Sequence, residues 1–174
     1  DSNARAVWAL GAVISLKEYL PNTIVDKALI CFLDSLPWVK NILSPRAIGF
    51  AIKGLYLCYS VTKQRDIIYI IEKLANNLIS NYDITETKNW KWFENYLTYA
   101  NSVLPEAMLY AYLVTGKLNY KSVALDSFNF LLSKLFFKNQ FDNISNINIS
   151  RYSYTNNELF TFKHFSNYNT SSTY

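Results

Sequence analysis

The residues GLYLCYSVT at positions 54–62 return in altered form as AMLYAYLVT at positions 107–115. Three identities share an offset of 53 residues: Tyr59 with Tyr112, Val61 with Val114, and Thr62 with Thr115. Leu78 and Leu131 keep the same offset farther along the chain. A repeat of helix, short turn and helix is typical of stacked helical hairpins, each of which needs a neighbour to bury its apolar face. The repeat therefore predicts an all-α fold built from antiparallel helical hairpins.

Apolar side chains recur at helical spacing along most of the first 137 residues, and breaks in this pattern separate six helices. Thr23 is a candidate N-cap of the second helix, which Pro37 is expected to stop, and Ser44 with Pro45 begins the third. The expected helices span residues 3–18, 23–36, 44–59, 65–79, 104–116 and 120–137. Residues 1–137 are thus predicted to form one domain of three hairpins.

The composition changes at about residue 138, where Asn, Ser, Thr and Tyr become dominant and helical periodicity disappears. Such a segment buries too little apolar surface to offset the entropy lost on ordering. We expect residues 138–174 to be a non-helical tail, irregular or disordered, with isolated β pairing around residues 144–154 as the alternative. His164 lies in this tail with no partner pattern around it, so it is expected to be inert.

The composition restricts the function classes. The chain has 174 residues, 51% of them hydrophobic, and its net charge of +4 is spread rather than clustered, which argues against nucleic acid as a partner. No apolar run approaches the roughly 20 residues that a membrane span requires. Cys31 and Cys58 lie in apolar helical segments and are expected to be small buried hydrophobes, with no metal or other cofactor predicted. The chain begins at Asp1 with no signal peptide, so we expect a cytoplasmic fragment of a longer protein, or a processed product.

The connection between the second and third hairpins concentrates aromatic, carboxylate and amide groups in the sequence WKWFENYLTYANSVLPE, residues 90–106. Aromatic rings stack on the apolar face of a sugar, while carboxylates and amides bind its hydroxyl groups. A carbohydrate pocket is one interpretation of this segment. The other is that Trp90, Phe93 and Leu97 form an apolar helical face that packs in the core, with Glu94 in solvent.

Two motifs resemble those of the six-hairpin, α/α-toroid glycosidase-like family, in a branch often encoded beside glycosyltransferases in microbial genomes. The first is similar to Asp-x-x-Gly-Arg-Ala-x-Trp-x-Leu-Gly and stands here at residues 1–11, with Ala4 in place of the glycine. The second is similar to Trp-x-Trp-Phe-Glu-x-x-Leu-Thr-Tyr-Asp-Asn-Ala-x-Leu-Pro-x-Ala and stands at residues 90–107. Here Ala100 replaces the aspartate and Ser102 the alanine. The resemblance covers residues 1–137 and does not reach the tail.

The resemblance implies that these hairpins are an open part of an (α/α) toroid with a carbohydrate pocket at one end. Glycoside hydrolysis generally uses two carboxyl groups, and the expected catalytic pair is Asp1 and Glu94. The expected substrate-binding residues are Arg5, Trp90, Trp92, Tyr99, Asn101 and Glu106. The toroid of the resembled family continues for several more hairpins, so this chain is expected to self-associate through its open edges.

The candidate residues also have structural interpretations. Asp1 is four residues before Arg5, so the two either share a pocket or form an ion pair at a helix start. Glu106 either binds substrate or is simply an acidic residue in a first helical turn, and Asn101 either binds a hydroxyl group or caps the following helix. A non-catalytic carbohydrate-binding toroid and a helical scaffold for protein partners are the alternative functions.

Overall fold

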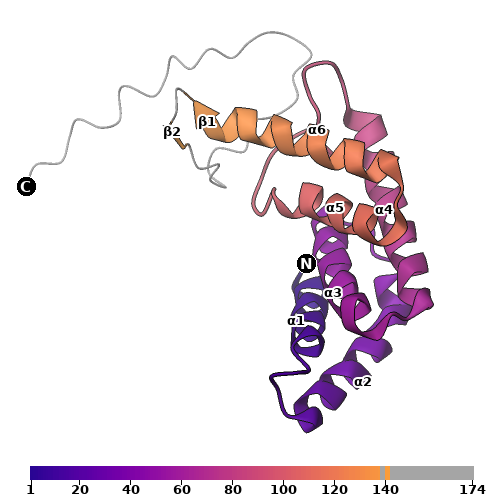
Figure 1. Cartoon of the computed structure of the whole chain (residues 1–174). Coiled ribbons are helices and arrows are strands. Elements are labelled where there is room, and N and C mark those ends of the chain that lie inside the picture. Colours follow the sequence, from indigo (N-terminus) through magenta and orange to yellow (C-terminus); the bar gives the residue numbers. More distant parts are fainter. Residues whose placement is uncertain (138–139, 142–174) are drawn as a thin grey trace, which may run out of the picture.

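We analysed a computed structural model that describes residues 1–137 and 140–141, with side chains as far as Leu135. The described part holds six α-helices (Figure 1), and they are α1 (Ser2–Ser15), α2 (Asn22–Val39), α3 (Pro45–Thr62), α4 (Arg65–Thr85), α5 (Val103–Thr115) and α6 (Leu118–Leu135). Two residue pairs follow as antiparallel strands, β1 (Phe136–Phe137) and β2 (Gln140–Phe141). The prediction of an all-α domain is confirmed for this part of the chain. The predictions for residues 142–174, His164 included, lie outside the described residues.

The helices stack as three consecutive hairpins. Helix α3 packs between α1 and α5, and each of these three helices also packs against the helix that follows it in sequence. In Figure 1, α1 and α3 lie side by side, whereas α6 lies across the end of the stack farthest from α2. The amino-terminal ends of α1, α3 and α5 meet at one end of the stack, because Asp1 contacts Ser44 and Arg46 contacts Tyr99. This end carries the connection between α4 and α5.

The 53-residue repeat has a structural counterpart at the ends of α3 and α5. Lys63 and Gly116 both adopt the left-handed conformation, with φ of 54° and 72°, and their N–H groups donate to the carbonyls of Tyr59 and Tyr112. The next helices begin at Arg65 and Leu118, which also differ by 53 positions. A left-handed residue just past a helix satisfies an otherwise unpaired carbonyl, so the same turn ends both inner helices.

Glycine allows α1 and α3 to approach closely. A Cβ built on Gly54 would lie 2.5 Å from the carbonyl oxygen of Val7, and one built on Gly11 would lie 2.3 Å from the carbonyl oxygen of Gly54. Only hydrogen fits at these two positions. Around this contact α3 contributes a core of fully buried aliphatic side chains, which includes Ile48, Ile52 and Leu55.

Some helix boundaries and burial assignments differ from the sequence predictions. Helix α2 continues through Pro37 and ends two residues later at Val39, which is fully buried, whereas Pro37 itself is exposed. Helix α4 extends to Thr85, six residues past its expected end, since Tyr82 is buried against Phe93. Cys31 is exposed, in contrast to the expectation, whereas Cys58 is buried.

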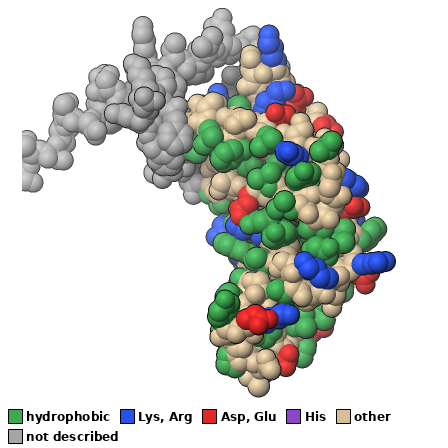
Figure 2. All heavy atoms as spheres, viewed as in Figure 1, with side chains coloured by type: hydrophobic (Ala, Val, Ile, Leu, Met, Phe, Trp, Pro, Cys, Tyr) green, Lys and Arg blue, Asp and Glu red, His purple; other side chains and the backbone are tan. Residues whose placement is uncertain are grey.

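No helix of the described part is both long enough and apolar enough to cross a bilayer. Charged side chains of both signs are scattered over the face seen in Figure 2, with no field of one sign.

Candidate functional site

Arg46, in the first turn of α3, organises the connection between α4 and α5. Its side chain is 5% exposed and its Nη1 atom pairs with the carboxylate of Glu94. Its Nε atom donates to the carbonyl of Tyr99 at 2.8 Å, and its Nη2 atom donates to Oδ1 of Asn101 at 3.0 Å. One buried guanidinium therefore binds the connection at three points, which suits the fixed fork geometry of arginine.

Asn101 stabilises the last turn of this connection through side-chain hydrogen bonds. Its Oδ1 atom also accepts from the backbone N–H of Thr98 at 3.0 Å, and its Nδ2 atom donates to the Thr98 carbonyl at 2.7 Å. Asn101 is 8% exposed, and its side-chain amide makes these hydrogen bonds inside the protein. Between the two lies Ala100, whose φ of 48° is in the left-handed region. Asparagine, aspartate and glycine tolerate that region better than alanine, so Ala100 adds backbone strain here.

Trp90 and Trp92 point into the protein. Trp90 is 6% exposed and its indole N–H donates to the Glu94 carbonyl at 2.7 Å. Trp92 is fully buried, and both rings pack near Phe130 of α6. Phe93 is buried as well. The alternative prediction, that Trp90 and Phe93 pack in the core, agrees with their burial. It was wrong in placing them on a helix, because this segment is a loop.

Asp1, Arg5 and Tyr99 form the exposed part of this end. The Asp1 carboxylate accepts from the hydroxyl of Ser44 at 3.5 Å. The Arg5 guanidinium lies 4.5 Å from the ring centroid of Phe50 and 5.9 Å from that of Tyr99. The Arg46 guanidinium lies 5.3 Å from the same Tyr99 ring, which is 40% exposed. Glu94 and Asn101 bind the same Arg46, so five of the eight sequence-predicted residues lie at one end of the hairpins.

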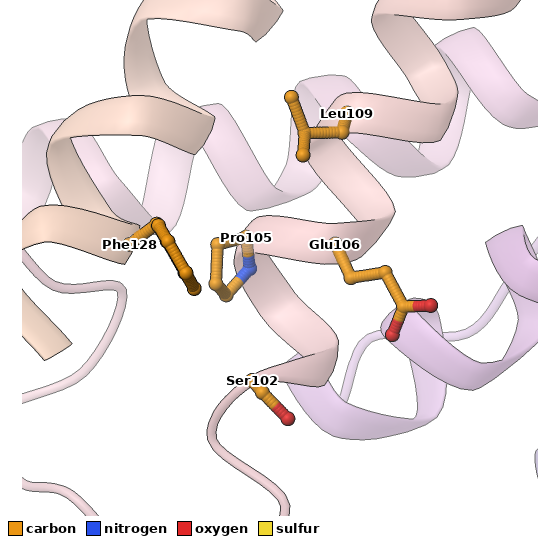
Figure 3. A pocket seen from close by; sticks show the side chains of 5 residues that line it. All are labelled: Ser102, Pro105, Glu106, Leu109 and Phe128. Carbon is orange, nitrogen blue, oxygen red and sulfur yellow. The ribbon is translucent and has the colours of Figure 1, made fainter. Parts of the chain in front are cut away.

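Glu106 lies in a different place, in the first turn of α5. Its carboxylate accepts from Lys53 at 2.9 Å and from the Tyr110 hydroxyl at 3.1 Å. Burial, with the Glu106 carboxylate beside it, raises the pKa of the Tyr110 hydroxyl. Glu106 borders a hollow of about 280 Å³ (Figure 3) that is lined by Ser102, Pro105, Leu109 and Phe128. Leu109 is 37% exposed here.

The sequence predictions missed Arg46, which binds Glu94, Tyr99 and Asn101 of the candidate site. A signal was present, because Arg46 and Tyr99 are separated by the 53-residue repeat, as are Lys53 and Glu106. Equivalent positions of adjacent repeats are close in space when hairpins stack, so a cation or carboxylate at such a position is a candidate for contact between repeats.

Among the described residues, no group of three or more His, Cys, Asp or Glu side chains is placed to hold a metal ion. A scan against protein-family models, a search of curated proteins and a search of solved structures each found no match for this chain.

Proposed function

We propose that this chain binds carbohydrate at the end of the hairpins where Asp1, Arg5 and Tyr99 lie. The observation that carries the proposal is the Tyr99 ring, which is 40% exposed while its backbone carbonyl is held by the buried Arg46. Because the Tyr99 backbone is fixed by this bond, only the side-chain torsions of the ring need to be ordered when it stacks on a sugar. The Arg5 guanidinium, 5.9 Å from the centroid of this ring, and the exposed Asp1 lie at the same end and supply a donor and an acceptor for sugar hydroxyl groups.

The proposed setting of this site is an open part of an (α/α) toroid in a glycosidase-like protein. The layer of α1, α3 and α5, with a partner helix behind each, supports the proposal, because repeating the hairpin around an axis would generate such a ring. Helix starts and inter-hairpin connections then collect at one mouth of the ring. We also infer a cytoplasmic location, which both free cysteines support, since thiols are generally kept reduced there.

The burial of Glu94 and its ion pair with Arg46 favour sugar binding over hydrolysis as the function. Hydrolysis uses one carboxyl group as the acid and another as the base or nucleophile, and the candidates for these roles are Asp1 and Glu94. The Glu94 side chain is 14% exposed and its carboxylate is engaged by Arg46, which leaves Asp1 as the accessible carboxylate of the pair. The motif aspartate that would add another carboxylate is Ala100 in this chain. The function that fits these residues best is sugar binding without hydrolysis, by a protein with a glycosidase-like fold.

The test is a binding screen of the full chain against a panel of immobilised oligosaccharides, followed by calorimetry with the best ligand. Tyr99→Ala should weaken binding by about tenfold or more, equivalent to about 1.4 kcal/mol. The matched control is Tyr19→Ala, since Tyr19 is 84% exposed but lies at the opposite end of α1. Failure of every oligosaccharide to bind, or equal weakening by both variants, would refute the proposal and leave a helical protein-binding scaffold as the better hypothesis.

A further inference from the structure

The Arg5 side chain, near the start of α1, lies at the proposed carbohydrate site without a polar partner among the described residues. Its guanidinium lies 4.5 Å from the ring centroid of Phe50 and 5.9 Å from that of Tyr99. Within the described part of the chain, this group contacts rings but makes no hydrogen bond and no ion pair. Arg5 is also exposed. The N–H donors of its guanidinium are therefore open to a ligand.

The other charged groups at this end of the hairpins bind elsewhere. Arg46 pairs with Glu94, so these two charges offset each other. The Asp1 carboxylate accepts from the Ser44 hydroxyl at 3.5 Å. The ion pair that the spacing of Asp1 and Arg5 allowed does not form between these two described residues. Asp1 therefore lowers the positive potential around Arg5 but leaves its donors unoccupied.

Phe50 of α3 holds the Arg5 guanidinium in place. A cation within about 6 Å of an aromatic ring centroid is attracted to the face of the ring. Phe50 is 5% exposed, and its ring stacks on Trp8 with centroids 5.8 Å apart, so the surrounding protein fixes this ring. A planar guanidinium that rests on a fixed ring has less freedom to lose when it binds a ligand. Phe50 therefore has the geometry of a positioning residue for Arg5.

The open donors of Arg5 distinguish between classes of sugar. Arginine binds a carboxylate through two parallel N–H···O bonds, which are stronger than hydrogen bonds to neutral hydroxyl groups. The Tyr99 ring is 40% exposed, and its distance of 5.9 Å from the Arg5 guanidinium is comparable with the size of one sugar ring. A uronic acid that stacks on Tyr99 can therefore place its carboxylate against Arg5.

We propose that the carbohydrate ligand of this site is acidic, namely an oligosaccharide of uronic acids whose carboxylate binds Arg5, and that Phe50 positions Arg5 for this contact. The inference rests on the proposed carbohydrate site and adds the class of sugar to it. A neutral oligosaccharide keeps the stacking on Tyr99 but lacks the charged contact.

Calorimetry of the full chain tests this proposal with oligomers of galacturonate, guluronate and mannuronate, each compared with its methyl ester. The acid and its ester share one linkage and differ in charge. The acid should bind about fivefold more tightly than the ester or better, because an exposed ion pair contributes up to about 1 kcal/mol and a bidentate one more. Arg5→Gln should reduce the affinity for the acid to that for the ester. Arg5→Lys should give an intermediate affinity, because it keeps the charge and loses the fork.

Arg65→Gln is the matched control for Arg5→Gln. Arg65 is also an exposed arginine at a helix start, but it begins α4 at the opposite end of the stack. This variant loses the same charge and should bind acid and ester as the wild type does. Phe50→Leu should lower the affinity for the acid and leave that for the ester unchanged, since it removes the ring beneath Arg5. Circular dichroism verifies that each variant remains folded.

The outcomes separate this inference from the proposed function. Equal binding of acid and ester, equal weakening of both by Arg5→Gln, or binding of neutral oligosaccharides alone would overturn the acidic ligand and leave the carbohydrate site in place. A sulfated oligosaccharide that binds as tightly as the uronates would overturn the assignment to a carboxylate. An unchanged ratio of acid to ester affinity in Phe50→Leu would overturn the positioning role of Phe50. Failure of every oligosaccharide to bind would refute the proposed function and this inference together.

Discussion

Replacing Arg46 by methionine should destabilise the protein more than the loss of any exposed ion pair. The variant keeps a long apolar stem but removes three interactions of the guanidinium, with the Glu94 carboxylate, the Tyr99 carbonyl and Oδ1 of Asn101. Glu94 would be left mostly buried without a cation, because its side chain is only 14% exposed. Removing one partner of a buried ion pair costs about 3–5 kcal/mol, and the remaining access of Glu94 to solvent favours about 3 kcal/mol.

Equilibrium urea unfolding, followed by circular dichroism, measures this loss as a change in the free energy of unfolding. The control is Lys117→Met, which breaks the 3.2 Å pair of Lys117 with Glu72, whose side chains are 49% and 32% exposed. An exposed pair of this kind contributes about 0–1 kcal/mol. If Arg46→Met cost no more than Lys117→Met, the reasoning that Arg46 anchors the connection between α4 and α5 would be refuted.

Three further substitutions have defined outcomes. Glu94→Gln keeps an acceptor but removes the charge opposite Arg46, so thermal melting should show a loss of about 2 kcal/mol. Gly54→Ala places a methyl group 2.5 Å from the Val7 carbonyl oxygen and should cost about 3 kcal/mol in urea unfolding. Tyr82→Phe should be neutral or stabilising near neutral pH, because the buried Tyr82 hydroxyl finds no hydrogen-bond partner among the described residues. Burial raises the pKa of Tyr82, so its titration does not affect stability below about pH 10 but lowers the free energy of unfolding as pH rises further, because the unfolded chain releases the proton first. Urea unfolding of Tyr82→Phe should therefore show a smaller alkaline loss than wild type.

Two control variants separate these mechanisms from general effects of substitution. Gly116→Ala introduces a methyl group with no atom within 4 Å, so it should cost only the left-handed conformation, about 1 kcal/mol. Tyr120→Phe removes a hydroxyl that donates to Oδ1 of Asn76 at 2.7 Å and should destabilise by about 1 kcal/mol. If Gly116→Ala were as costly as Gly54→Ala, close helix approach would not be the reason for glycine at position 54. A loss for Tyr82→Phe equal to that for Tyr120→Phe would contradict the unpaired state of the Tyr82 hydroxyl.

The hairpin fold could be predicted from the sequence because it depends on local hydrophobic periodicity and on a repeat. The repeat predicted matching hairpins, although the expected end of the third helix at residue 59 is three residues short of its end at Thr62. The residues after Thr62 and Thr115, Lys63 and Gly116, both adopt the left-handed conformation. The buried side chains of Leu78 and Leu131 also follow from the repeat. The exposure of Leu109 does not follow from the repeat or from helical periodicity. Leu109 is 37% exposed because no helix of the described chain covers that side of α5.

The geometry of the candidate site was harder to predict from the sequence because it depends on contacts between hairpins. Periodicity does not place Arg46 against Glu94, which is 48 residues away. It also does not distinguish a buried indole, such as that of Trp92, from an exposed ring such as that of Tyr99. That distinction requires knowing that the loop folds back on α6. The sequence therefore indicated residues 90–106 as the candidate segment, while the structure was needed to assign each side chain to the interior or the surface.

A titration of the isotopically labelled full chain with an oligosaccharide, followed by amide NMR spectra, tests the proposed site most directly. Binding at the open end should shift the amide resonances of Arg5, Tyr99 and their neighbours. The resonances of Lys63 and Gly116, at the opposite end of the stack, should stay unchanged. Shifts concentrated at that opposite end, or no shifts at saturating oligosaccharide, would contradict a carbohydrate site formed by Asp1, Arg5 and Tyr99.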